Sequence, residues 1–251
     1  NILIDSGDNN AESKTVGYLK SNGVGTIDYL IATHPDTDHI GAMDKVVYAF
    51  DIGYFSMPII EGIDTKNYDN LMTAIESKDI TNTALHYSDV VKLSDEVYFE
   101  VLSPIKGKFY ENNNDYSIII RLVYGDTSFM FTGDGERVNE EDMIISGKDI
   151  SSDVLKVGHH GSSSSSSMEF LASVDPKLAI ISSGKDNKYG HPHKEVINNL
   201  EQLDIKYLNT AIEGDIVVTS DGKKIEVNEK TFVIDKVEGY LFAIFEKVGV
   251  N

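Results

Sequence analysis

The residues best suited to chemistry are four potential metal ligands within six positions of the 251-residue sequence: His34, Asp36, Asp38 and His39. So dense a set cannot reach one ion without strain, but it can serve two adjacent ions if the segment is a loop. The apolar run 29–32 predicts a strand before the ligands, and residues 40–43 begin a predicted helix after them. Loops between strands and helices commonly hold sites in α/β proteins. A capped, solvated turn would explain a single Asp here, but not two His interleaved with two Asp.

A fifth potential ligand, Asp134, follows the apolar run 128–132 and stands between two glycines. Glycines let the backbone approach another group closely, so a carboxylate at this position can bridge two cations. The alternative role for Asp134 is to cap the helix predicted to follow it.

Five of the seven histidines lie in loops at the ends of predicted elements, and this concentration favours chemistry: His34, His39, His159, His160 and His191. The adjacent pair at 159 and 160 follows a strand-like run and is bracketed by glycines. A single histidine is usually structural or solvated, and we assign that role to His86 and His193.

Composition limits the kind of site. The sequence has no cysteine, which excludes disulfides and zinc–thiolate centres, so a metal would rest on His and carboxylate ligands that suit zinc, manganese or iron.

The formal net charge of −19 argues against an extended nucleic-acid surface. The apolar stretch 240–245 is too short to span a bilayer, which takes about 20 residues. Location stays open between the cytoplasm and a secreted or extracellular-face position on a bacterial cell.

Strand-like and helix-like runs are mixed along the whole chain. The predicted strands are 2–5, 28–33, 97–102, 117–124, 128–132, 153–157, 178–182, 216–219 and 224–227. The predicted helices are 11–21, 41–50, 68–77, 136–146, 168–174 and 194–203. Groups of strands with helices in both halves indicate two sheets packed face to face with helices outside, a four-layer αββα sandwich of the α/β class.

Residues 1–230 are predicted to form one domain from two halves, roughly 1–115 and 116–230. The tail 231–251 is an extension with an apolar stripe, which fits an extra helix, a strand pair or a contact with another segment. The serine run 162–167 has two interpretations, a flexible loop or a loop that lines a site.

Four motifs together resemble the metallo-β-lactamase superfamily: His-x-Asp-x-Asp-His at 34–39, Thr-Gly-Asp at 132–134, Gly-His-His-Gly-Ser at 158–162 and Tyr-Gly-His-Pro at 189–192. Within it the sequence is most similar to the hydrolase domain of ComEC-type competence proteins and their stand-alone relatives. The resemblance runs from about residue 2 to 227 and implies a four-layer αββα sandwich with two metals at the sheet edges. It also implies that the family's first strands precede Asn1.

The resemblance implies a ligand set, motif by motif. His34 and Asp36 would hold one metal, and Asp38, His39 and His160 the other, with Asp134 as the bridge. Of the adjacent histidines we favour His160 over His159 as the ligand.

Two departures from the superfamily pattern affect this ligand set. Asp36 stands where a second His is more common, which makes that site harder and puts manganese beside zinc. Many relatives place a further His ligand near 114–117, where this sequence has none. Asn114 and Ser117 loosely match a ComEC-like Asn/Ser pattern, and we expect them to bind substrate.

The expected reaction is hydrolysis of a phosphodiester, in a small molecule or in single-stranded DNA, by two divalent ions that acidify a bridging water. Asp38 would orient that water, and His159 or His191 would stabilise charge or protonate the leaving group. Ser162 and Ser163 would contact the phosphate. The alternatives are a phosphorylcholine esterase, lactonase or β-lactamase, and, in another class, a non-catalytic domain of a DNA-uptake transporter.

Overall fold

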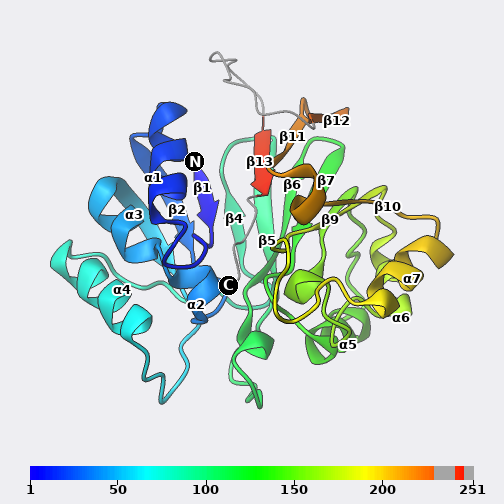
Figure 1. Ribbon diagram of the computed structural model, residues 1–251, viewed down its shortest axis with the longest axis horizontal. Helices are drawn as coiled ribbons and strands as arrows, with labels where there is room; N and C mark the ends of the chain where they lie inside the picture. The colour runs from blue at the N-terminus through cyan, green and yellow to red at the C-terminus, as the bar shows by residue number, and fades with distance from the viewer. Residues whose placement is uncertain (229–240, 246–251) are drawn as a thin grey trace.

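The computed structural model describes residues 1–228 and 241–245, which form three β-sheets with helices on both sides (Figure 1). The first sheet is parallel, in the order β1 (Ile2–Ile4), β2 (Thr26–Ile31), β3 (Asp51–Ser56). A small antiparallel sheet has β11 (Ile216–Ser220) between β12 (Ile225–Asn228) and β13 (Leu241–Phe245).

The largest sheet has seven strands in the order β10-β9-β8-β7-β6-β5-β4. Their bounds are β4 Val90–Lys92, β5 Val97–Ser103, β6 Ile119–Tyr124, β7 Thr127–Phe131, β8 Val154–Lys156, β9 Leu178–Ile181 and β10 Lys206–Asn209. β4 to β7 pair antiparallel, whereas β7 to β10 pair parallel, so the carboxyl ends of β7, β8 and β9 meet at one edge.

The helices fall into two groups on opposite sides of the molecule (Figure 1). The chain forms α1 (Glu12–Ser21), α2 (Thr37–Ile40), α3 (Met43–Ala49) and α4 (Lys66–Ser77), and later α5 (Arg137–Ile145), α6 (Met168–Val174), α7 (Lys194–Gln202) and α8 (Thr210–Glu213). Short 3-10 turns cover Asn114–Tyr116 and Gly158–Gly161.

Buried apolar side chains form three clusters, because alternate residues of a strand point to opposite faces of its sheet. In β2, Leu30 packs among the helices of the first group, whereas Ile31 lies in the cluster between the sheets. In β7, Phe129 joins that middle cluster, whereas Met130 packs with α5, α6 and α7. Ile216 of β11 also belongs to the middle cluster. These clusters separate four layers, and the predicted αββα sandwich is confirmed.

Some elements differ from the sequence-based predictions. The segment Thr33–His39 is not a loop throughout: the carbonyl of Asp36 accepts hydrogen bonds from the amides of His39 and Ile40, and α2 begins at Thr37. The predicted helix 41–50 starts two residues later, as α3. The strands β3, β4 and β10 were not predicted, and β13 lies in the tail, for which a strand pair was one of the alternatives. In the tail, 241–245 pairs with β11 as one strand, and the rest of 229–251 lies outside the described residues.

None of the helices among the described residues is long and apolar enough to cross a membrane.

Candidate metal centre

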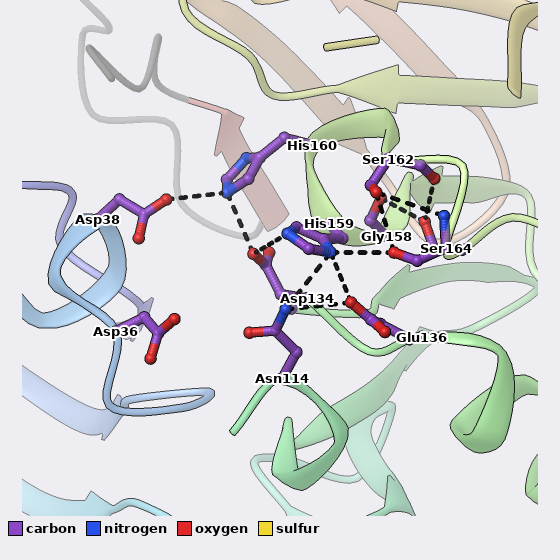
Figure 2. A network of polar contacts seen from close by, with 12 residues as sticks. Asp36, Asp38, Asn114, Asp134, Glu136, Gly158, His159, His160, Ser162 and Ser164 are labelled. Atoms are coloured by element: carbon purple, nitrogen blue, oxygen red, sulfur yellow. Dashed lines mark hydrogen bonds and ion pairs between the residues drawn. The ribbon is translucent and has the colours of Figure 1, made fainter. Parts of the chain in front are cut away.

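All six predicted metal ligands converge where the first sheet and the seven-stranded sheet end side by side. His34 and Asp36 follow β2, and Asp38 and His39 lie in α2 directly after them. The other two follow neighbouring parallel strands, Asp134 after β7 and His160 after β8. Figure 2 shows the carboxylates of Asp36, Asp38 and Asp134 facing the same space as the ring of His160.

Four of these side chains are close enough to share one cation. Asp38, His39, Asp134 and His160 each offer a ligand atom, and those atoms all lie within 4.8 Å of one another. His160 Nε2 is 3.3 Å from Asp38 Oδ2 and 3.4 Å from Asp134 Oδ2. His39 Nε2 is 3.2 Å from Asp134 Oδ1. Ligand atoms bound about 2 Å from a zinc ion lie roughly 3 to 4 Å apart, so the spacing fits a cation at the centre.

The remaining pair, His34 and Asp36, also lies near Asp134. His34 Nε2 is 4.0 Å from Asp36 Oδ2 and 4.0 Å from Asp134 Oδ2. Asp134 is therefore close to a candidate ligand of each predicted group.

The hydrogen bonds of the fully buried His34 show whether its surroundings fit a metal ion. The hydroxyl of Thr33 donates to Asp5 Oδ2 at 2.8 Å, so its oxygen can accept from His34 Nδ1–H, 3.1 Å away. That tautomer leaves a lone pair on His34 Nε2, a buried atom with no hydrogen-bond partner among the described residues. Buried polar atoms are rarely left unpartnered in proteins, and a cation would satisfy this one.

Protons on His39 and His160 offset part of the negative charge in the cluster. Burial lowers the pKa of His160, but the nearby carboxylates of Asp134 and Asp38 outweigh burial and raise that pKa to about 9. Burial and the neighbouring His39 together lower the pKa of His34 to about 3, so its ring is neutral. Burial raises the pKa of Asp134, but the rings of His160 and His39 hold it well below its usual range. Because metal ligands must lose such protons, a bound cation would replace them.

Outer groups hold the ligand rings in place. His39 Nδ1 is 2.7 Å from Asp5 Oδ2, and His160 Nδ1 is 2.7 Å from the carbonyl oxygen of Ser182. Each contact turns the ring so that Nε2 points into the cluster, as outer partners of metal-bound histidines do.

His159 lies beside the cluster and is held by a different acid, Glu136. Its Nδ1 is 2.9 Å from Glu136 Oε1, and its Nε2 is 3.7 Å from Asp134 Oδ2 (Figure 2). Asn114 supports the pair, with Nδ2 3.2 Å from Glu136 Oε1 and 3.4 Å from His159 Nδ1. The structure therefore puts His160 among the six candidate ligands and leaves His159 free to face the pocket.

The pocket in front of the cluster encloses about 140 Å³. It is lined by Asp36, Asp38, Asp134, His159, His160, Ser183, Gly184, Asn187, Tyr189 and His191. The ring of His191 lies 5.5 Å from that of His159. Burial and the neighbouring histidines lower the pKa of His191 to about 4, so the ring is neutral near pH 7.

None of the four predicted substrate contacts lines this pocket. Asn114 donates to Glu136 beside His159 instead. Ser117 is fully buried, and its hydroxyl accepts a hydrogen bond from the amide of Asp134 at 3.1 Å, so it supports the ligand loop from behind. Ser162 is buried and bonds Ser164 through its hydroxyl at 2.9 Å. The amide of Ser163 donates to His193 Nδ1 at 2.9 Å, which also gives His193 the structural role predicted for it.

The serines 162–167 make defined hydrogen bonds that support the turn before them. This role differs from both predicted ones, a flexible loop and a loop that lines the site. Ser165 Oγ donates to the carbonyl of Gly158 at 2.8 Å, and Ser167 Oγ caps α6. The carboxylate of Glu140 accepts from the amides of Ser166 and Ser167. These contacts hold the preceding turn, in which His159 and His160 have φ angles of 43° and 54°. Such left-handed backbone is strained for residues other than glycine and persists where the surroundings enforce it.

Sequence reasoning missed two residues that position the site, Asp5 and Glu136. Each directly follows a strand or a ligand motif, which is a usable signal. Their targets, however, lie 34 and 23 residues away and become neighbours only through the sheets.

Comparison with known proteins agrees with the fold. Residues 1–185 match the family model of the metallo-beta-lactamase superfamily, and the chain belongs to that superfamily. ComE operon protein 3 of Bacillus subtilis (strain 168) is 34% identical over 206 residues, covering 82% of this chain and 26% of the relative.

Two further relatives come from other bacteria. Recombination protein 2 of Haemophilus influenzae is 31% identical over 233 residues, covering 91% of this chain and 27% of the relative. Competence protein ComA of Neisseria gonorrhoeae is 31% identical over 205 residues, covering 81% and 27%. The predicted resemblance to ComEC-type competence proteins is confirmed, although the chain spans only about a quarter of the length of these relatives.

Proposed function

We propose that this protein hydrolyses phosphodiester bonds with two divalent cations, zinc or manganese, held on either side of Asp134. The observation that carries the proposal is the oxygen-rich character of the cluster, in which three carboxylates accompany three histidines around one space. Hard carboxylate ligands suit ions that bind phosphate oxygens, and they tolerate manganese as well as zinc.

The cations, when bound, would supply hydroxide near neutral pH and Lewis acidity toward a phosphoryl oxygen. Asp38 keeps part of its carboxylate open to the pocket, with 27% of its side chain exposed, and can orient the attacking water. His159 points Nε2 toward the same space and can donate a proton to the departing oxygen. Glu136 holds the ring in that orientation.

The names of the relatives extend the proposal to DNA. Competence protein ComA and Recombination protein 2 are named for processes that involve DNA, and single-stranded DNA is therefore a candidate substrate. The net charge of −19 opposes a long polyanion bound along the surface and favours a short segment or a small diester that enters the pocket.

A substrate panel tests the proposal. Protein reconstituted with zinc or with manganese is assayed on bis-p-nitrophenyl phosphate, single-stranded DNA and nitrocefin. We expect turnover of the two phosphodiesters and none of nitrocefin. No phosphodiester turnover with either metal would contradict the proposal, and nitrocefin turnover alone would favour a lactamase.

Asp134→Ala tests the bridging role in the same assay. We expect loss of bound metal and of activity, because the variant removes the ligand between the two sites. Asp126→Ala, at an exposed turn residue, is the control and should retain both. Activity that survives in Asp134→Ala would show that the bridging assignment is wrong.

A further inference from the structure

One end of the pocket carries no candidate metal ligand and is built by the loop 184–191. Tyr189 lines this end, and 55% of the residue is exposed, so a ligand in the pocket can reach the side chain. Its ring is stacked on His191 at 5.6 Å and 22° between planes. His191 is in turn nearly parallel to the candidate ligand His160, at 6.5 Å and 20°. The three rings form a row from the metal cluster to the rim.

The loop that carries Tyr189 is fixed in place. Asn187 Nδ2 donates to the carbonyls of Gly184 and His191 at 2.9 and 2.7 Å, and Asn187 Oδ1 accepts from the amide of His191 at 2.9 Å. His193 Nε2 lies 3.2 Å from the carbonyl oxygen of Tyr189. An aromatic ring on a loop held in this way is preorganised, so a ligand that binds it loses little free energy to ordering the loop.

The loop is rich in positive charge, whereas the whole molecule is strongly negative. The segment 184–194 contains three lysines and one aspartate, whereas the chain has a net charge of −19. Lys185 and Lys188 are exposed, and Lys188 Nζ lies 5.0 Å from the centre of the Tyr189 ring. Ammonium groups beside an exposed aromatic ring match a ligand that combines a planar ring with a phosphate.

We propose that Tyr189 is a stacking platform for the nucleobase next to the scissile phosphate. The proposal rests on the proposed hydrolysis and names a residue that would position its substrate. A base lies one sugar away from its phosphate, and Tyr189 lies one ring, His191, away from the metal cluster. Stacking on an aromatic side chain tolerates every base, because each base has a π-face.

A choline headgroup is the competing occupant, since quaternary ammonium groups also bind aromatic rings. Three features oppose it: Lys188 places a like charge beside the ring, Lys185 adds a second like charge, and Tyr189 is the one tyrosine, phenylalanine or tryptophan that lines the described pocket. Recognition of such a cation usually takes a cage of several aromatic side chains.

The absence of tryptophan from the sequence gives a direct binding test. Tyr189→Trp introduces a single indole, whose fluorescence is quenched when a base stacks on it. Zinc-loaded variant is titrated with thymidine 5′-monophosphate, ribose 5-phosphate and phosphorylcholine. We expect quenching by the nucleotide only. Equal quenching by ribose 5-phosphate, quenching by phosphorylcholine, or none with any of the three would overturn the platform.

Kinetics test the same residue without the indole. The parent protein, Tyr189→Phe and Tyr189→Leu are compared on an oligothymidylate and on the same oligomer made of abasic sugars. We expect Tyr189→Leu to raise KM for the oligothymidylate about tenfold with little change in kcat, Tyr189→Phe to behave as the parent, and the abasic oligomer not to distinguish the variants. A Leu variant with parental KM would contradict the proposal.

The two proposals fail separately. Quenching by the nucleotide in a protein that turns over no phosphodiester would retain the stacking platform and reject the hydrolysis. Turnover of bis-p-nitrophenyl phosphate without nucleotide quenching would retain the hydrolysis and reject the stacking platform.

Discussion

Asp5 at the end of β1 and His39 in α2 form a short contact, 2.7 Å between Oδ2 and Nδ1, that fixes which nitrogen of His39 faces Asp134. The carboxylate also accepts from the amide and hydroxyl of Thr33, both at 2.8 Å. Burial raises the pKa of Asp5, but His39 outweighs it and the pKa stays below its usual value. Asp5 therefore remains an anion that orients a ligand ring without touching the metal site itself.

Asp5→Asn should weaken metal binding about 10- to 100-fold, because the ring of His39 loses its charged outer partner. The measurement is the dissociation constant for zinc by competition with a chromogenic chelator. Asp51→Asn, at an exposed position of β3, is the matched control and should bind metal as the parent does. Unchanged affinity in Asp5→Asn would remove Asp5 from the site.

Glu136→Gln should lower kcat on a phosphodiester about tenfold while metal content and KM stay near parental values, because the acceptor that orients His159 loses its negative charge and no longer stabilises the protonated ring. Steady-state kinetics with metal analysis on the same samples separate this effect from loss of the cluster. Glu195→Gln, which breaks only the exposed pair with Arg137, is the control. A fall in metal content that parallels the fall in kcat would mean that Glu136 supports the ligands instead.

Gly41→Ala should destabilise the protein by about 2 kcal/mol or more, since an added Cβ would lie 2.5 Å from the carbonyl oxygen of Thr37 and 2.6 Å from the amide nitrogen of Asn9. Both atoms are backbone, so neither can swing aside. Gly17→Ala is the contrast: nothing lies within 4 Å of its Cβ, and alanine in α1 should stabilise by roughly 0.5 to 1 kcal/mol. Urea unfolding of both variants checks the opposite signs.

Asp115 should make stability depend on pH. Burial, and then the neighbouring Glu136, raise the pKa of Asp115 to about 6, and its buried Oδ1 has no hydrogen-bond partner among the described residues. A folded-state pKa above the unfolded value of about 3.9 means that the contribution of Asp115 is present below pH 4 and is lost as pH rises through 6. The loss corresponds to about 2 to 3 kcal/mol.

Asp115→Asn should therefore be more stable than the parent protein above pH 7, with the advantage shrinking toward pH 4. Thermal unfolding of the metal-free proteins between pH 4 and 8 measures the difference. Asp69→Asn, at an exposed position of α4, serves as control. A difference between Asp115→Asn and the parent that does not vary with pH would contradict the raised pKa.

The ligand positions were predictable because each sits where an apolar run stops at a polar motif, and the ends of neighbouring strands meet in space. Asp134 and His160 follow β7 and β8, which pair in parallel. A sequence pattern that places both residues after strands therefore also predicts that they lie close together. The strand β3 was missed because Gly53 interrupts its pattern; a Cβ there would lie 2.7 Å from the carbonyl of Asp28, a close approach that sequence does not reveal.

Contacts between different elements account for other differences. Ser117 looks like a substrate contact because it stands next to motif residues, yet its hydroxyl turns inward and accepts from the amide of Asp134, 17 residues away. Which way a side chain turns depends on neighbours brought by other elements. The helix α2 was missed because its four residues are too few to display a helical period.

The distinct contacts of the serines 162–167 also fix how many residues this run can have. Six identical letters occupy non-equivalent environments: Ser165 reaches back to Gly158, Ser166 has a φ of 58°, and Ser167 starts α6. A substitution changes one of these environments, whereas adding or deleting one serine moves every later residue out of its place. Repetitive stretches ordinarily tolerate the gain or loss of one residue. We expect this protein to tolerate neither the insertion nor the deletion of a serine in this run.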